Sequence, residues 1–338
     1  MTLKDFWYIV AESKDLKRDT VIAARVLGEW LALFRDEAGN AVAIEDRCLH
    51  RSAQLSKGCV QQGKLQCGYH GWVYDNKGSV IHVPSLGANS NSPHKARTFQ
   101  ICEVDDYIYA KLSEAMDSET QPFRIPFYKA KGWAAIRLKN LFQNIVTNCA
   151  ENFVDIPHTA FVHPGIFRVT RNEKLTATVQ RKDGIVMVIY RGERTNLGIF
   201  SRFLNHSGKE ISHTDAFYMP NVTSVDYTFN ENRRFIITSQ SIPVGEEKTL
   251  VYTDLTYNYG IWNQLAKPLI RWQAQTIINQ DIVILNNQME TIKRFGAHFS
   301  NTPVDVIHIF IESIRDALAK GQDPRQLPEK QVEIEFWV

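Results

Sequence analysis

The chain of 338 residues is long enough for two domains, and its 44% hydrophobic and 22% charged residues are ordinary proportions for a globular protein. Its 39 basic and 37 acidic side chains are spread along the whole sequence, which argues against a nucleic-acid-binding stripe and against a polybasic membrane patch. The first residues lack a basic segment followed by an apolar one, and no apolar run approaches the ~18 residues of a membrane span, so we expect a cytoplasmic protein.

The first third of the sequence predicts antiparallel β structure. Apolar, strand-like runs alternate with short segments rich in Asp, Asn and Gly, a pattern typical of hairpins. The polar segment 84–97 predicts a loop, and residues 113–126 have the composition of a linker. The expected strands are residues 30–34, 41–44, 72–74, 79–83 and 100–112. We therefore place a domain boundary between residues 115 and 116.

The remainder of the sequence mixes strands with helices. Residues 140–158 have helical character, and residues 269–294 have helical periodicity throughout, with Pro268 where proline is tolerated at a helix start. The expected strands are residues 175–179, 185–190, 214–229, 233–241 and 249–258. The predicted fold class is α+β: an all-β domain of residues 1–115, then a domain of residues 116–338 in which helices flank an antiparallel sheet.

Two short pairs of Cys and His are the strongest chemical signal in the sequence. Cys48 and His50 form the first pair, and Cys67 and His70 form the second. The five cysteines are an odd number in a chain with no expected secretory signal, which argues against a disulfide framework. Thiolate and imidazole both bind transition metals, so these four residues admit either a zinc ion or an iron–sulfur cluster.

The order of the four residues distinguishes the two kinds of metal site. A C2H2 zinc finger carries its two histidines on a helix that follows both cysteines. Alternating C-x-H and C-x-x-H pairs in a small β domain are the Rieske arrangement, in which two cysteines bind one iron of a [2Fe–2S] cluster and two histidines bind the other. A structural zinc ion, or four unrelated residues, is the alternative interpretation.

The segments 48–51 and 67–72 resemble the Rieske domain of the Rieske non-haem iron oxygenases. Gly68 stands where a proline is common in that family, which changes the loop but removes no ligand. The resemblance implies that residues 1–115 form a Rieske [2Fe–2S] domain and that residues 116–338 form the catalytic domain.

The resemblance continues in the second domain. Asp155, His158 and His163 match the D-x-x-H-x(4)-H segment of the family. Two neutral imidazoles can anchor Fe(II) in a 2-His-1-carboxylate triad that leaves positions open for O2. Two histidines five residues apart would be weak evidence by themselves, but beside a Rieske-like domain we expect them to be iron ligands.

Helical periodicity selects Asp281 as the carboxylate of this triad. Its neighbours at three and four residues are all apolar, namely Ile277, Ile278, Ile284 and Leu285. An acid within an apolar stripe is costly unless it is paired or binds a metal, whereas Glu290 has polar neighbours and is expected in solvent. The family's placement of the carboxylate on a late helix agrees with Asp281. A buried Asp satisfied by the backbone or by an Arg is the alternative.

Asp155 is expected to act beside the iron rather than as a ligand. It precedes His158 by three residues and can accept a hydrogen bond from the ring nitrogen that faces away from the metal. In the family that the chain resembles, the same aspartate also bridges to a cluster histidine of the neighbouring subunit, which would be His70. The resemblance therefore implies a homotrimer.

The implied activity is that of a non-haem iron monooxygenase. Electrons from NAD(P)H would reach the cluster through a separate reductase, and O2 would serve to hydroxylate a C–H bond or to remove a methyl group oxidatively. Two alternatives from other classes are a Rieske electron-transfer protein, which would need only the first third of the chain, and a zinc-containing binding protein without catalysis.

Residues 148–158 are most similar to the saxitoxin-tailoring hydroxylases of cyanobacteria, which implies a small guanidinium alkaloid as substrate. An oxidative O-demethylase or hydroxylase of an aromatic acid is the alternative. A cation would be bound by aromatic faces, for which the candidates are Tyr218, Tyr227, Tyr252, Tyr257 and Trp262. Arg202 or Arg234 in the pocket would instead favour an aromatic acid.

Overall fold

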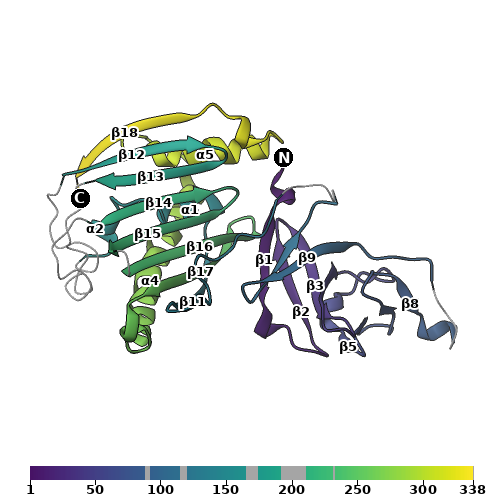
Figure 1. Cartoon of the computed structure of the whole chain (residues 1–338). Helices are drawn as coiled ribbons and strands as arrows, with labels where there is room; N and C mark the ends of the chain where they lie inside the picture. The colour runs from purple at the N-terminus through teal and green to yellow at the C-terminus, as the bar shows by residue number, and fades with distance from the viewer. Residues whose placement is uncertain (88–91, 115–119, 165–173, 192–210, 231–232, 338) are drawn as a thin grey trace. The chain divides into compact units, whose positions relative to one another are not determined.

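The structure, a computed structural model, describes residues 1–337 except 88–91, 115–119, 165–173, 192–210 and 231–232. The chain divides into two compact units (Figure 1). The N-terminal unit comprises Leu3–Arg124 with Pro243–Gly245, and the C-terminal unit comprises Met1–Thr2, Ile125–Ile242 and Glu246–Val338. The expected boundary between residues 115 and 116 lies outside the described residues.

The N-terminal unit is built from two antiparallel sheets. The six-stranded sheet has the order β1-β10-β9-β4-β3-β2, and the four-stranded sheet has the order β5-β6-β7-β8. The strands of the first are β1 (Trp7–Glu12), β2 (Val21–Val26), β3 (Glu29–Arg35), β4 (Ala41–Glu45), β9 (Thr98–Val104) and β10 (Tyr107–Lys111). Those of the second are β5 (Cys59–Gln61), β6 (Lys64–Gln66), β7 (Val73–Tyr74) and β8 (Val80–His82). All strands expected in this region are present.

The hairpin between β7 and β8 shows why these turns form. The side chain of Asp75 accepts hydrogen bonds from the backbone N–H groups of Lys77 and Ser79, at 2.9 and 2.8 Å. Gly78 has a φ of +78°, and a Cβ there would collide with the carbonyl oxygen of Ala96. The turn therefore requires glycine, and it fixes the register of the sheet that carries the second Cys/His pair.

The C-terminal unit contains an eight-stranded antiparallel sheet in the order β11-β17-β16-β15-β14-β13-β12-β18. Its strands are β11 (Ala134–Phe142), β12 (Lys174–Lys182), β13 (Ile185–Arg191), β14 (Ser212–Tyr218), β15 (Val222–Asn230), β16 (Arg233–Gly245), β17 (Lys248–Asn258) and β18 (Lys330–Trp337). Its helices include α1 (Val146–Asn152), α2 (Thr159–Val162), α4 (Asn263–Phe295) and α5 (Val306–Ala319). Helix α4 packs against β11, and α5 packs against β12 and β13, behind the sheet in Figure 1.

The helix expected over residues 140–158 is wrong at its beginning. Residues up to Phe142 continue β11, which pairs with β17 along its whole length. The buried side chain of Asn144 ends this strand, because its Oδ1 accepts a hydrogen bond from the N–H of Ile145 while its Nδ2 donates to the carbonyl of Leu285. Pairing with a distant strand thus overrides the local helical preference.

The single strand expected over residues 214–229 is wrong, since it is two strands, β14 and β15, separated by a turn at residues 219–221. Three further elements differ from the expectation. Helix α4 begins at Asn263, before Pro268, because the Asn263 side chain accepts from the N–H of Tyr259 and donates to the carbonyl of Gly132. Helix α5 and strand β18 were not expected, although α5 buries an apolar face that includes Phe310 and Ile314. The α+β class itself is confirmed. None of the described helices has the length and apolar character needed to cross a membrane.

Candidate metal centres and active site

The two Cys/His pairs of the N-terminal unit lie in loops with the same backbone pattern. The N–H of Cys48 donates to the carbonyl of Ala53, five residues later, and its own carbonyl accepts from the N–H of Ser52. In the second loop the N–H of Cys67 donates to the carbonyl of Trp72, also five residues later, and its carbonyl accepts from the N–H of Gly71. Ser52 and Gly71 have φ values of +57° and +72°. The loops are therefore two copies of one kind of turn, each presenting a Cys and a His.

The four side chains of these loops converge. Cys48 and Cys67 are buried, and the rings of His50 and His70 lie 4.5 Å apart between centroids. Nδ1 of His50 is buried and has no hydrogen-bond partner, which fits a histidine whose nitrogen awaits a metal. His70 is exposed at the surface.

Two tyrosines contact the cysteine sulfurs. The Tyr74 hydroxyl donates to Sγ of Cys48 at 3.2 Å, and the N–H of Tyr69 donates to Sγ of Cys67 at 3.5 Å. Hydrogen bonds to the sulfurs are among the factors that tune the potential of an iron–sulfur cluster. The sequence predicts neither contact, since nothing in the spacing of the ligands indicates which donors will reach the sulfurs.

The two matched loops fit the Rieske arrangement, in which two cysteines bind one iron of a cluster and two histidines bind the other. Among the described residues, compact groups of three or more candidate ligand atoms occur at two places, and both lie in the C-terminal unit.

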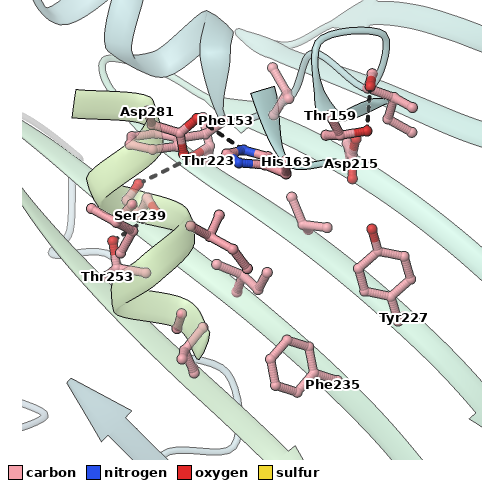
Figure 2. Close-up of a pocket in the computed structure, with 18 of the residues that line it drawn as sticks. Phe153, Thr159, His163, Asp215, Thr223, Tyr227, Phe235, Ser239, Thr253 and Asp281 are labelled. Carbon is pink, nitrogen blue, oxygen red and sulfur yellow. Dashed lines mark hydrogen bonds and ion pairs between the residues drawn. The ribbon is translucent and has the colours of Figure 1, made fainter. Parts of the chain in front are cut away.

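The first compact group consists of His158, His163 and Asp281, whose ligand atoms all lie within 4.8 Å of one another. His158 and His163 flank the single turn of α2, where the N–H of Val162 donates to the carbonyl of His158. This turn brings the two rings to 5.3 Å between centroids. Figure 2 shows Asp281, from α4, facing His163.

Both histidines of this group face the same carboxylate oxygen. Oδ1 of Asp281 lies 3.1 Å from Nε2 of His163 and 3.6 Å from Nε2 of His158. Asp281 is only 4% exposed and His163 only 1%. Two imidazole nitrogens and one carboxylate oxygen around a common point are the donor set of a 2-His-1-carboxylate iron site.

The electrostatics of the group follow from burial and proximity. Burial raises the pKa of Asp281, but the proximity of the His158 and His163 rings outweighs it, and the pKa lies below its ordinary value. Burial lowers the pKa of His158, and the carboxylates of Asp155 and Asp281 raise it to about 9. The concentration of negative charge around the two rings favours a cation between them.

Gln280 orients His163 from behind. Its Oε1 lies 2.8 Å from Nδ1 of His163, so this nitrogen carries the proton and Nε2 presents its lone pair toward Asp281. Gln280 directly precedes Asp281, and no sequence pattern marks it as a site residue. The expected partner of His158 is placed more loosely, since Oδ2 of Asp155 lies 3.4 Å from Nδ1 of His158 without a well-formed hydrogen bond.

The predicted stripe of buried apolar side chains around Asp281 on α4 is present only in part. Ile278 and Leu285 are buried around Asp281, but Ile284 is 43% exposed, so the stripe is narrower than expected. Glu290 is exposed, as predicted from its polar neighbours. The contrast between the two acids on this helix therefore holds in the structure.

A pocket of about 200 Å³ opens onto the three residues (Figure 2). Of the five aromatic residues proposed to line it, only Tyr227 does, while Tyr259 lines it unexpectedly. Tyr218, Tyr252, Tyr257 and Trp262 are absent from its walls. Arg234 also does not line it and instead forms an ion pair with Asp226, whereas Arg202 lies outside the described residues.

The second compact group consists of Glu151, His308 and Glu312. Nδ1 of His308 lies 2.6 Å from Glu151, and Nε2 lies 3.3 Å from Glu312. The hydrogen bond to Glu151 raises the pKa of His308. A protonated histidine therefore compensates the acids without a metal, and the group ties α1 to α5.

Comparisons with known proteins agree with this geometry. Residues 6–100 match the model of the Rieske [2Fe-2S] domain. Methylxanthine N3-demethylase of Pseudomonas putida is 34% identical over 173 residues, 48% of each chain. The oxygenase component of dicamba O-demethylase of Stenotrophomonas maltophilia is 23% identical over 314 residues, 88% of this chain and 89% of that protein. The chain matches only about half the length of several of these curated relatives, 48% and 55% for two of them.

Solved structures show the same fold. Dicamba monooxygenase bound to dicamba superposes with a TM-score of 0.80 at 19% identity, covering 94% of this chain and 98% of that one. A variant of the Pseudomonas putida protein NdmA with caffeine superposes with a TM-score of 0.78 at 22% identity, covering 96% and 93%. Residues 146–320, more than half of the chain, match the model of the vanillate O-demethylase oxygenase C-terminal domain. The chain therefore belongs to the Rieske non-haem iron oxygenases that carry this C-terminal domain.

Proposed function

We propose that the chain is the oxygenase component of a Rieske monooxygenase, which uses O2 and externally supplied electrons to oxidise a C–H bond of a small molecule. The observation that carries the proposal is the convergence of His158, His163 and Asp281 on one point at an apolar pocket. The same chain carries a Rieske domain. When bound, the [2Fe–2S] cluster supplies single electrons and the iron supplies open positions for O2.

The residues that would hold these groups are assigned as follows. Cys48 and Cys67 would bind one iron of the cluster, and His50 and His70 would bind the other. The matched loops and the unpartnered Nδ1 of His50 support this assignment. In the C-terminal unit the donor set and the buried, unpartnered Oδ1 of Asp281 support a mononuclear iron site.

The polypeptide has three further tasks in such a reaction. Gln280 holds the ring of His163 in one tautomer. Apolar side chains such as Val225 and Leu255 line most of the pocket and exclude water from it. The walls orient the substrate so that one C–H bond points toward the three ligands.

Electrons are proposed to come from NAD(P)H through a separate reductase and to pass between copies of the chain in a homotrimer. His70 is exposed, and the side chain of Asp155 is 48% exposed, which supports a contact between His70 of one copy and Asp155 of the next. Asp155 would then link the cluster histidine to His158, from whose ring it lies 3.4 Å.

The two candidate outcomes, hydroxylation and demethylation, share one chemical step. In that step one oxygen atom of O2 enters a C–H bond as a hydroxyl, and the other leaves as water, which consumes two electrons and two protons. When the hydroxylated carbon is a methyl group on oxygen or nitrogen, the product loses formaldehyde spontaneously. Demethylation is favoured by the names of the relatives above, which are demethylases of methylxanthines and of dicamba. A saxitoxin-type substrate, expected from the sequence, has no support among these relatives.

A single-turnover experiment tests the proposal. The holoprotein is reduced with dithionite, freed of excess reductant and mixed with isotopically labelled O2 and a panel of methylxanthines, methoxybenzoates and saxitoxin-type alkaloids. We expect labelled alcohol, or formaldehyde, in an amount set by the reduced clusters. His163→Ala is the control and should give no product while retaining the cluster spectrum. Product formation by that variant, or a colourless wild-type protein, would contradict the proposal.

A further inference from the structure

The pocket floor is formed by three adjacent strands whose inward side chains are sorted by chemistry. Successive residues of a strand point to opposite faces, so every second residue of β15, β16 and β17 lines the pocket. Across the strands these residues form a hydroxyl row (Thr223, Ser239, Thr253), then an aliphatic row (Val225, Ile237, Leu255). Tyr227 and Phe235 follow as an opposed pair. In Figure 2 this aromatic pair is drawn at the opposite end of the view from Asp281.

The hydroxyl row has one O–H donor more than the described protein groups accept in hydrogen bonds. The Thr223 hydroxyl donates to the backbone carbonyl of Ser239, at 3.5 Å. The hydroxyls of Ser239 and Thr253 lie 3.2 Å apart, and either can donate to the other. That contact uses one of their two protons, and within the described part of the chain neither hydroxyl has another partner. Both side chains are buried, so the second proton is directed at whatever occupies the pocket.

The charged groups around the pocket are already compensated. Asp215 contacts Nε2 of His213 at 2.9 Å through one oxygen, and its other oxygen accepts from the hydroxyl of Tyr190 at 3.0 Å. Asp281 faces two histidines. No Lys or Arg is among the described residues that line the pocket. Asp155 also lines the pocket, but its side chain is 48% exposed and lies 3.4 Å from Nδ1 of His158. A buried cation would lack a buried, uncommitted carboxylate, and a buried carboxylate would lack a cationic partner among the described lining residues.

From these observations we infer that the substrate is a neutral, mostly apolar ring compound that carries a hydrogen-bond acceptor, such as a carbonyl oxygen or a ring nitrogen. This acceptor receives the hydrogen bond that the Ser239–Thr253 pair has left to donate. The ring lies over the aliphatic row, between the apolar strand residues and the face of α4 that carries Ala274 and Ile277. This inference rests on the proposed function, since it names the class of substrate for the same site. It excludes both a guanidinium ion and an aromatic carboxylate as the preferred ligand.

Three probes of nearly the same shape separate the classes. They are para-methoxyacetophenone, which is neutral and offers a carbonyl acceptor, para-methoxybenzoate, which is an anion, and para-methoxybenzamidine, which is a cation. Their dissociation constants are measured by calorimetry on the holoprotein. We expect the ketone to bind at least about tenfold more tightly than either charged probe, because only the charged probes must be desolvated without a partner.

Variants assign this preference to the hydroxyl pair. The double substitution Ser239→Ala and Thr253→Val should weaken binding of the ketone about tenfold and leave the two charged probes nearly unchanged. Thr223→Val is the matched control, since its hydroxyl already bonds to the backbone, and it should bind the ketone like the wild type. An unchanged circular dichroism spectrum and an unchanged content of mononuclear iron verify that the C-terminal unit of each variant folds.

The outcomes separate the subsite from the oxygenase. Tighter binding of either charged probe, undetectable binding of the ketone, or full affinity in the double variant would overturn the inference. If the ketone binds as expected but no probe is oxidised in a single turnover, the subsite stands and the proposed oxygenase function fails for these probes.

Discussion

The two proposed metal sites are built in opposite ways. The cluster ligands come from two short loops with the same backbone hydrogen bonds, and the Cys and His of each loop are two or three residues apart. The mononuclear site joins His158 and His163, around one turn of helix, to Asp281 on a helix far along the chain. The ligands of a local site can be predicted from their spacing in the sequence alone. A ligand that tertiary packing brings to a site can be predicted only from the energetic cost of burying its charge among apolar residues.

The largest expected effects come from removing one ligand of each site. Cys67→Ser should abolish the visible cluster spectrum and all turnover, because a thiolate ligand is lost. His163→Ala should keep that spectrum, lose about one iron per chain and give no oxidised product. Absorption spectra and iron analysis measure both results. If His163→Ala retained its full iron content, the mononuclear site would be misplaced.

The second comparison uses two acids on α4. Asp281→Ala removes a buried carboxylate that faces two histidines, so it should lose the mononuclear iron and single-turnover product. Glu290→Ala removes an exposed side chain and should change stability by less than about 0.5 kcal/mol, with activity unchanged. Thermal unfolding and product yield distinguish them. Similar behaviour of the two variants would refute the argument from periodicity.

Asp155→Asn is expected to separate the two sites without removing either. Asparagine keeps the shape but replaces one acceptor oxygen with a donor, so it cannot accept one imidazole N–H group at each of its two terminal atoms. The variant should remain brown and bind iron, yet its reduced cluster should reoxidise about ten- to a hundredfold more slowly with O2 and substrate. Rapid mixing follows this reoxidation. A wild-type rate would leave Asp155 with a purely structural role.

The smallest expected effect concerns Gln280. Gln280→Leu removes the acceptor for Nδ1 of His163 and should weaken Fe(II) binding about tenfold, an effect that excess iron overcomes. Gln280→Glu keeps an acceptor at this position and should bind iron nearly as the wild type does. Titration of the iron-depleted protein with Fe(II), at constant cluster content, gives the dissociation constants. Equal constants in the leucine variant would mean that packing alone orients His163.

Several hairpin strands of both units were predictable because their turns have a local sequence signal, as the Asp75 turn shows. Residues 140–142 were mistaken for helix because their partner, β17, lies far along the chain. The ligand candidates could be named from spacing and from the apolar neighbours of Asp281. Gln280 and Tyr74 could not, because their roles depend on which nitrogen or sulfur they reach after folding.

The pocket combines a floor made by strands with proposed iron ligands carried by helical segments. Residues such as Val225 and Ile237 can therefore be exchanged without moving a ligand. Substitutions on α4 lack that freedom, because Ile277 and Ile278 lie one turn from Asp281. Engineering for a new substrate should accordingly begin on β15 and β16, where substitutions can change substrate binding and leave the proposed iron ligands in place.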